Sequence, residues 1–151
     1  MSGLQLFDDR LSALINNLSP AARKEMARTI AKKLRASQQQ NIKSQRAPDG
    51  TPFKPRRAEA ARNKQGRVKR EMFAKLRTAK YMKATATDSE AVVGFVGKVQ
   101  RMARVHHYGL RERASKFGGI LKYEERPLLG LNKHALLVIE TVVLDFFKKA
   151  P

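Results

Sequence analysis

Hydrophobic residues near the start of the chain recur at steps of three and four positions, the spacing of one face of a helix. The residues that follow this spacing are Leu4, Phe7, Leu11, Leu14, Ile15 and Leu18. They predict a short amphipathic helix over about residues 4–17. Ser19 followed by Pro20 has the form of an N-cap and a proline in the first helical turn, so a second helix is expected to begin there.

The second helix has a narrow apolar stripe surrounded by basic residues. Its apolar residues stand at steps of four, at Ala22, Met26, Ile30 and Leu34. Residues 37–46 keep helical propensity through their glutamines but add only Ile42 to this stripe, so we expect them to continue exposed or to fray. Unbroken from residue 20 to residue 47, the helix would be about 42 Å long, a reach that suits contact with a neighbouring subunit.

Turn residues follow the second helix. Residues 47–50 are expected to end it, because a residue before proline disfavours the helical conformation and Asp-Gly favours a turn. Pro52 and Pro55 keep the next residues extended, with Phe53 as their apolar anchor. A basic extended or flexible segment is therefore expected over about residues 48–70.

The middle of the chain changes to a strand-like pattern. Residues 72–79 have the spacing of a short helix. Alternation over residues 82–87 and β-branched residues over 91–96, separated by an Asp-Ser-Glu turn, predict an antiparallel hairpin. Residues 99–107 predict a short helix or a turn, and residues 110–126 predict a loop or a second small hairpin.

Asn132 is expected to cap a last helix that is apolar over most of its circumference. Such a helix has to be buried on several sides, so we expect it to pack across the sheet. The predicted fold class is α+β, a single domain over residues 1–151. In it, N-terminal helices accompany a small antiparallel sheet packed against a hydrophobic C-terminal helix.

The charge of the chain indicates an anionic partner. Its 151 residues carry a formal net charge of +19, far more than solubility requires. Residues 1–19 sum to −1, residues 20–80 to +15 and residues 81–151 to +5. Any contact with an anion, whether DNA or an acidic protein surface, is therefore expected in the middle third.

Other features of composition restrict the location of the protein. The chain contains no cysteine, so no disulfide framework and no thiolate site can form. Its longest apolar run, residues 135–139, is far shorter than the roughly 20 residues that span a bilayer. Asp8 and Asp9 stand where a signal peptide would be basic and then apolar. We expect a cytosolic protein without membrane contact.

Two adjacent histidines are the first candidates for chemistry, since imidazole is a common metal ligand and proton shuttle. His106 and His107 would point in different directions, and no Cys, Asp or Glu stands near them in sequence to complete a site. We therefore favour a role in packing or at an interface. A nuclease site of the His-Asn-His type, from His107, Asn132 and His134, would lack its usual cysteine pairs.

No other catalytic pattern stands in the sequence. The glycines do not form a phosphate-binding loop, because no Gly-Lys-Ser/Thr run follows a strand. No serine stands in a G-x-S-x-G motif, and the acidic pairs 8–9 and 124–125 fall at a helix start and in a solvated loop. We expect a protein that is not an enzyme and needs neither cofactor nor metal.

A cluster of basic residues could neutralise several phosphates. The candidates for anion contact are Arg23, Lys24, Arg28, Lys32, Lys33, Arg35, Arg56, Arg57, Arg67, Lys69 and Arg70. Phe53 and Phe73 are the aromatic residues within this region, too few for base stacking, so DNA would be bound through its backbone. A solvated basic face is the alternative. Phosphate binding would weaken steeply with salt, which distinguishes the two.

Three short motifs give the chain a resemblance to a known family. Their residues are Pro48, Asp49, Gly50, Phe53 and Pro55, then Arg104, His106, Tyr108 and Gly109, then Arg126, Pro127, Leu128, Leu129 and Gly130. In this order they resemble the virion-morphogenesis, or tail-completion, proteins of tailed bacteriophages with contractile tails, which are related to neck and tail-terminator proteins. Phe53 stands where that family often has tryptophan.

The resemblance implies a structural protein whose subunits form a ring that completes the tail and enables it to join the head. Its implied partners are further copies of itself, the tail tube, and head or neck proteins, first in the host cytoplasm and then in the virion. Gly109 and Pro127 would fix turns, while Tyr108, Leu128 and Leu129 would pack near the subunit boundary. A small basic protein that binds the DNA backbone is the alternative.

Overall fold

The computed structural model describes residues 3–56, 71–113 and 116–149. The helices and strands are α1 (Gly3–Asn16), α2 (Pro20–Lys43), β1 (Met82–Ala86), β2 (Ala91–Phe95), α3 (Gly97–Tyr108), β3 (Arg111–Arg113), β4 (Ile120–Lys122) and α4 (Lys133–Lys149). The strands form two antiparallel pairs, β1 with β2 and β3 with β4. The α+β class is confirmed. Most of the basic segment expected over residues 48–70 lies outside the described residues.

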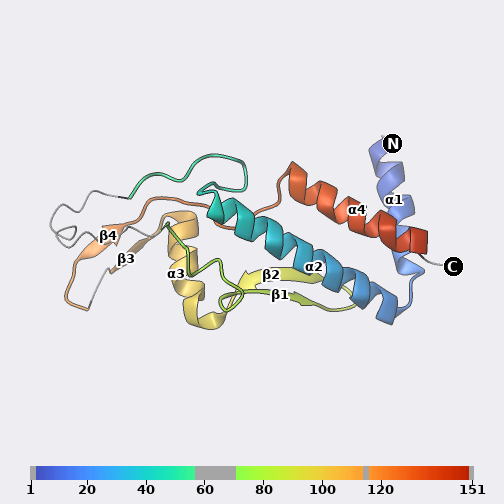
Figure 1. Ribbon diagram of the computed structural model, residues 1–151, viewed down its shortest axis with the longest axis horizontal. Coiled ribbons are helices and arrows are strands. Elements are labelled where there is room, and N and C mark those ends of the chain that lie inside the picture. Colours follow the sequence, from blue (N-terminus) through green and yellow to red (C-terminus); the bar gives the residue numbers. More distant parts are fainter. Residues whose placement is uncertain (1–2, 57–70, 114–115, 150–151) are drawn as a thin grey trace.

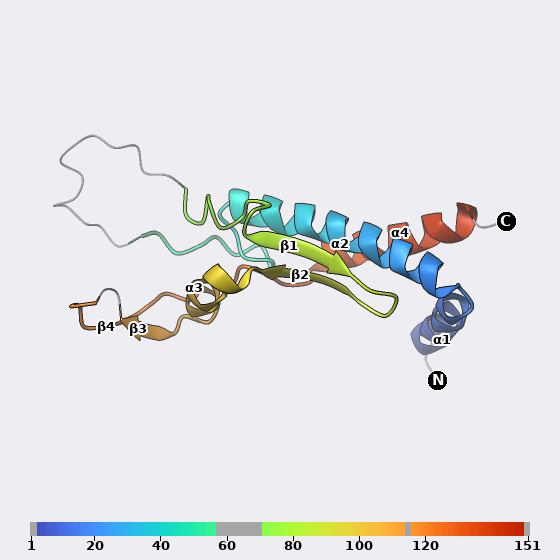
Figure 2. The ribbon, with the colours of Figure 1, turned by 90° about the horizontal axis from the view of Figure 1, so that it is seen from below.

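Helix α2 runs through the middle of the molecule. The β1–β2 hairpin packs along one side of α2, and α4 packs along another (Figures 1 and 2). Helix α1 lies at the end where α2 begins. Helix α3 and the β3–β4 hairpin lie at the opposite end, so the molecule is elongated.

Local interactions determine where α2 begins and where it ends. The hydroxyl of Ser19 accepts a hydrogen bond from the N–H of Ala22 at 3.1 Å, and Pro20 opens the first turn, so the predicted start is confirmed. The helix ends at Lys43, earlier than the turn at Pro48, because the backbone of Gln45 adopts a left-handed φ of 57°. The C-terminal end is thus set by a residue in the left-handed conformation typical of helix ends.

The glutamine-rich part of α2 is helical to Lys43 and buries one face, so the expectation of an exposed or frayed arm is wrong. Ile42 is fully buried, and Gln38 is only 3% exposed. The Gln38 amide donates to the carbonyl of Gly130 at 3.0 Å and accepts from its N–H at 3.1 Å. A polar side chain can be buried here because both halves of its amide are hydrogen-bonded.

The first hairpin forms as predicted. Its register pairs Met82 with Phe95 and Ala86 with Ala91. The hydroxyl of Thr87 accepts hydrogen bonds from the N–H groups of Ser89 and Glu90, which fixes the turn. Met82, at the first position of β1, is fully buried.

Residues 72–80 form a series of turns, so the short helix expected over 72–79 is wrong. Phe73 has a φ of 65°, a left-handed value that interrupts any helix at this point. Gln45 holds the segment from outside, because its amide donates to the carbonyl of Met72 and accepts from the N–H of Met72. Leu76 is thereby buried.

After β2, the structure decides between helix and turn for residues 99–107, and between loop and hairpin for residues 110–126. Residues 97–108 are the helix α3, and the second small hairpin exists as β3 and β4. Among the described residues, no helix is long and apolar enough to span a membrane.

Helix α4 starts as predicted but packs differently. The side chain of Asn132 accepts a hydrogen bond from the N–H of Ala135 at 2.7 Å, which confirms the cap. The helix packs on α2 instead of across the sheet, because α2 lies between them. Leu136, Leu137 and Leu144 are each about half exposed, so the expected burial on several sides is not reached within one subunit.

The buried apolar residues form two separate groups. The first, called the sheet cluster, consists of Ile42, Ala47, Phe53, Leu76, Met82, Ala103 and Leu128. The second, called the helical cluster, consists of Met26, Val142 and Val143, with partly buried residues of α1 packed against it. Helix α2 contributes to both and therefore connects them.

Replacing Gln38 with leucine should destabilise the protein, because the N–H and C=O groups of Gly130 would lose their partners. Each unpaired backbone group costs about 1–3 kcal/mol, so we expect a loss of about 2–4 kcal/mol in the free energy of unfolding, measured with urea. Gln40→Leu, on the exposed side of the same helix, is the matched control and should change it by less than about 0.5 kcal/mol. Equal losses would contradict the role of the buried amide.

Candidate functional site

The three sequence motifs meet in space. The segments 48–55, 104–109 and 126–130 lie far apart in the chain, yet they are joined by the hydrogen bonds and contacts described below. We call this region the motif junction. It lies where the C-terminal end of α2, α3 and the chain leading into α4 come together (Figure 1).

Arg126 connects all three motifs. Its side chain is buried, and its guanidinium donates to the carbonyls of Lys54 at 2.8 Å and Pro55 at 3.0 Å. Its backbone N–H donates to the carbonyl of His106 at 2.8 Å. A buried cation is tolerable here because it donates to backbone carbonyls, groups that an irregular segment cannot pair within itself.

His107 supports the segment that follows Arg126. Its Nδ1 accepts a hydrogen bond from the N–H of Leu128 at 3.0 Å, so the neutral ring carries its proton on Nε2. Leu128 is fully buried in the sheet cluster. The second of the two adjacent histidines is therefore a structural acceptor.

His106 lies in a row of aromatic side chains. Its ring makes edge contacts with Phe73 and Tyr123, both at 5.1 Å between centroids, and Phe73 meets Phe53 in the same way at 5.6 Å. The row passes from the first motif through the second to the residues before the third. Such contacts add packing energy beyond the burial of area.

Hydrogen bonds and contacts with neighbouring and distant segments hold the turn at Pro48 in place. The carboxylate of Asp49 accepts from the N–H of Thr51 at 2.9 Å, which lowers the pKa of that exposed carboxyl group. Gly50 has a φ of 90°, which favours glycine, and the amide of Asn132 donates to the carbonyl of Pro48 at 2.8 Å. A Cβ on Gly130 would lie 3.0 Å from the ring of Pro48, so the first and third motifs touch directly.

Gly109 ends α3 and meets the third segment. Its φ is 64°, and its N–H bonds to the carbonyl of Val105. A Cβ placed on it would lie 2.8 Å from the backbone nitrogen of Glu125. Both the left-handed conformation and the close approach of backbone therefore require glycine at this position.

Burial lowers the pKa of both histidines in the junction. His106 is affected first by desolvation and then by the nearby Arg126 guanidinium, and its Nδ1 is buried without a hydrogen-bond partner among the described residues. Burial also lowers the pKa of His107, although Glu125 opposes the effect. The neutral form that accepts from Leu128 is thereby favoured.

The junction organises backbone and brings together no set of metal ligands. Within the described ranges, no group of three or more His, Asp or Glu residues could hold a metal ion. An open cleft of about 440 Å³ lies beside the junction, between α3 and the β3–β4 hairpin. At the edge of this cleft, Arg101 and Glu112 form a bidentate ion pair. The Nε of Arg101 donates to Oε2 of Glu112 at 3.0 Å, and its Nη2 donates to Oε1 at 2.8 Å.

The remaining motif residues have different environments. Arg104 is exposed, and Tyr108 is 60% exposed. Pro127 and Leu129 are partly buried, and Leu129 packs against the sheet cluster. Leu128, expected near a subunit boundary, is instead inside the subunit, because its N–H bond to His107 directs this segment into the core.

Of the basic candidates for anion contact, Lys24, Arg28, Lys32 and Arg35 stand at steps of three and four residues along α2. Arg23 donates to the carbonyls of Leu18 and Asp88, and Arg28 pairs with Glu25. On α2, Lys24, Lys32 and Lys33 are exposed and Arg35 is partly buried, while Arg56 is exposed beyond the Pro48 turn. The other four, Arg57, Arg67, Lys69 and Arg70, lie outside the described residues.

Sequence reasoning missed three polar residues that build the junction. Gln38 and Gln45 were interpreted only as helix-favouring residues, and Asn132 only as a cap, yet all three bind backbone groups distant in the chain. A glutamine at a position where the helical spacing places the apolar stripe, as at Gln38, is a signal that could have indicated burial. No comparable signal marks Gln45.

Substitutions at Gly109 and Gly50 should distinguish the cost of backbone strain from the cost of a steric clash. Gly50 shares the left-handed φ but has no atom within 4 Å of an added Cβ, so Gly50→Ala should cost about 1 kcal/mol. Gly109→Ala should cost more than about 3 kcal/mol because the backbone at Glu125 must also move, and Gly109→Val should fail to fold. Urea unfolding and soluble yield measure this, and equal losses at the two glycines would contradict the close approach.

Acid should weaken the junction at a pH set by its histidines. In the unfolded chain histidine has a pKa near 6.5, and in the folded chain both pKa values are lower, so the unfolded state binds protons first. Stability should be full above about pH 6.5 and should fall towards about pH 5, before most carboxylates titrate. His106→Phe, which retains an aromatic ring, should reduce the dependence of the free energy of unfolding on pH, as measured by urea unfolding. An unchanged dependence on pH would contradict the role of His106.

Comparison with known proteins identifies the family of this chain. The model of the phage virion morphogenesis family matches residues 3–148. Over 150 residues the chain is 43% identical to tail completion protein S of Escherichia phage P2, an alignment that covers 99% of this chain and 100% of that protein. No solved structure matches. Since the family match extends over nearly the whole chain, the protein is a member of the phage virion morphogenesis family.

Proposed function

We propose that this protein completes the end of a phage tail and enables the tail to join the DNA-filled head. The observation that carries the proposal is the full-length similarity to a tail completion protein. Residues 1–151 act together in this role as one domain. The protein assembles in the host cytoplasm and is then part of the tail or neck of the virion.

The structure supports a role in assembly through what its motifs do. The motif junction uses its one buried arginine and both of its histidines to hold backbone or to pack against aromatic rings. Interactions of this kind fix loops relative to one another. A structural protein needs fixed loops, because a subunit that meets several neighbours has to present its surfaces in constant positions.

Exposed apolar side chains support association with further subunits. Phe117 is 93% exposed and Ile120 is 69% exposed at one end of the molecule, and Leu137 is 59% exposed on α4. Phe117 and Ile120 both belong to the β3–β4 hairpin region, and large apolar side chains exposed in this way favour a surface that another protein covers. We therefore propose a homo-oligomeric ring that contacts the tail tube on one side and head or neck proteins on the other.

The alternative of a DNA-coating protein has weaker support. The net charge of +19 favours contact with an anion. Within the described part of the chain, however, Arg23 and Arg28 are engaged by protein oxygens. The charge is also compatible with an acidic face on a neighbouring virion protein.

Deleting the gene for this protein from the phage or prophage that encodes it should leave DNA-filled heads and tails that do not join. Electron microscopy of the lysate and plaque counts would measure the defect. Adding purified protein to the mixed heads and tails should restore complete infectious particles, whereas protein denatured beforehand should not. Joined particles in the untreated deletion lysate, or a lysate without tails of normal length, would contradict the proposal.

A further inference from the structure

We propose that one exposed side of α2 binds the phosphate backbone of double-stranded DNA. Four basic residues define this side, Lys24, Arg28, Lys32 and Arg35, and we call them the basic row. The inference goes beyond the proposed function and does not depend on it, because phosphate binding is a property of this surface alone. It concerns a single local contact, as suits a protein at the joint between a tail and a DNA-filled head, and not the coating of DNA.

Helical spacing places the basic row on one side of α2. Its residues follow one another at steps of four, four and three, so they lie within about 80° of the circumference at about 100° per residue. Lys24, Arg28 and Lys32 are exposed, and Arg35 is partly buried. The row is about 16 Å long at about 1.5 Å per residue. A DNA duplex carries about nine phosphate charges over that length, so phosphates outnumber the cations of the row.

The neighbouring elements leave the basic row open to solvent. The β1–β2 hairpin and α4 pack on α2, and Met26, Ala27 and Leu34 are among the residues of α2 that are buried. Figure 2 shows α2 at the edge of the molecule, with the hairpin on its inner side. Near the end of α2, the amide of Gln39 donates to the carbonyl of Arg77 at 2.9 Å. The turns over residues 72–80 therefore border the row beyond Arg35.

The carboxylates that adjoin α2 do not cancel its charge. Three of them pair with arginines, Glu25 with Arg28 at 3.2 Å, Asp88 with Arg23 at 3.8 Å and Glu71 with Arg77 at 3.7 Å. Lys24 and Lys32 have no carboxylate partner among the described residues. Residues 20–43 and 71–90, which include the hairpin and both of its neighbouring turns, together carry eleven basic and four acidic side chains. The excess of positive charge therefore persists when all of these neighbours are counted.

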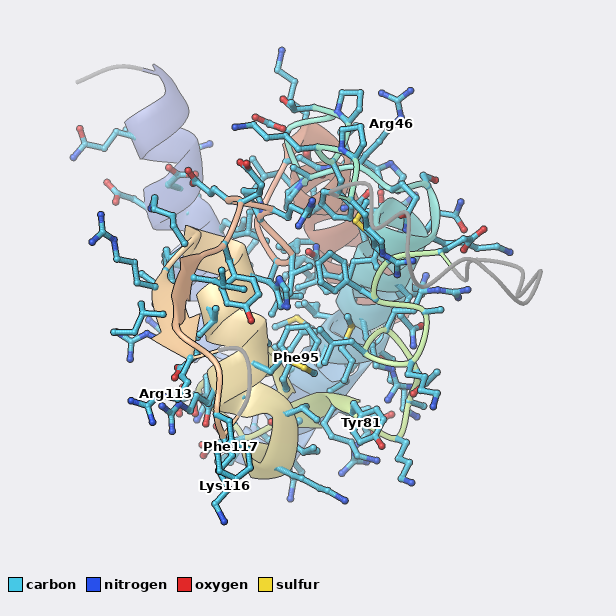
Figure 3. All side chains as sticks on the ribbon, turned by 90° about the vertical axis from the view of Figure 1, so that its left-hand side faces the viewer. Arg46, Tyr81, Phe95, Arg113, Lys116 and Phe117 are labelled. Atoms are coloured by element: carbon cyan, nitrogen blue, oxygen red, sulfur yellow. The ribbon has the colours of Figure 1, made fainter. Side chains whose placement is uncertain are left out.

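The chemistry of this side favours DNA over a protein partner. None of the exposed large hydrophobic residues in the described part of the chain lies in α2. A protein interface has an apolar centre that is depleted in lysine, whereas a surface that contacts DNA is polar and positively charged. Figure 3 looks along the molecule and shows the exposed Phe117 apart from α2, so the apolar end and the basic row are separate surfaces.

The contact should be independent of base sequence. Helix α2 contains no aromatic residue on which bases could stack, and lysines bind phosphates as point charges. Contacts with phosphates fix the position of a protein on the duplex but carry no sequence information. A second copy of this chain is a poor occupant, because each copy carries a net charge of +19 and like charges repel.

Two variants with equal changes in charge test the inference. The row variant carries Lys24→Gln and Lys32→Gln, and the matched control carries Lys133→Gln and Lys148→Gln on α4. All four lysines are exposed, and glutamine favours a helix about as well as lysine does, so folding should be preserved. Circular dichroism and thermal unfolding check this. The control lysines share the exposed side of α4 with Glu140 and Asp145, so they belong to no comparable excess of charge.

The probe is a fluorescein-labelled duplex of about 24 base pairs, which is longer than the row. Fluorescence anisotropy in about 0.05 M salt should show binding by the wild type, equally to two duplexes of unrelated sequence. The logarithm of its binding constant should fall with the logarithm of salt concentration with a slope of about −4 or steeper. The row variant should bind more than about 10-fold more weakly, with a slope reduced by about 2, whereas the control should change affinity less than about 3-fold.

Several results would overturn the inference. These are no binding by the wild type up to about 100 µM protein in low salt, equal losses in the two variants, or an unchanged salt slope in the row variant. Unlabelled polyglutamate that displaces the labelled duplex better than unlabelled DNA does would instead indicate an acidic protein as the partner. None of these results decides the proposed function, because tail completion is measured by the joining of heads and tails. Conversely, joined particles in the gene-deletion lysate would remove that function and leave DNA binding by α2 standing.

Discussion

The structure depends on the burial of α2 along its whole length. The helix has too few large apolar residues for a single broad face, so it is covered on different sides by different elements, the β1–β2 hairpin on one and α4 on another. Where its sequence becomes polar, Gln38 replaces hydrophobic contact with two hydrogen bonds to Gly130. The C-terminal part of α2 is thereby tied to the chain that leads into α4. The β1–β2 hairpin and α4 take their positions from this helix, while α3 packs on β2.

The motif junction shows how a small domain can make irregular chain rigid. Extended segments and turns leave their carbonyl and N–H groups without ladder partners, and burying them unpaired would be costly. Arg126, Gln45 and His107 supply those partners from a distance. Because each bond joins segments that are remote in sequence, the loops are fixed relative to one another. This explains how residues with reactive side chains serve assembly.

The sequence allowed the periodic elements to be predicted and left their packing open. The start of α2, the β1–β2 hairpin and the cap at Asn132 follow from local spacing and capping chemistry. The position of α4 against α2 depends on competition between surfaces distant in sequence, which no local pattern contains. The left-handed φ of Phe73 is fixed by contacts with its surroundings, and nothing in its sequence marks it. Three motifs were recognised, but that Arg126 unites them became visible only in space.

The division of the buried residues into two clusters has a consequence for the way the protein opens. The helical cluster has only three buried residues, supported by partly buried side chains of α1 and α4, whereas the sheet cluster has seven. Separate cooperative units of unequal size open with unequal free energies. The end that carries α1 is therefore expected to open before the junction does. A subunit of this kind can adapt one end to its neighbour during assembly without losing the geometry of the other.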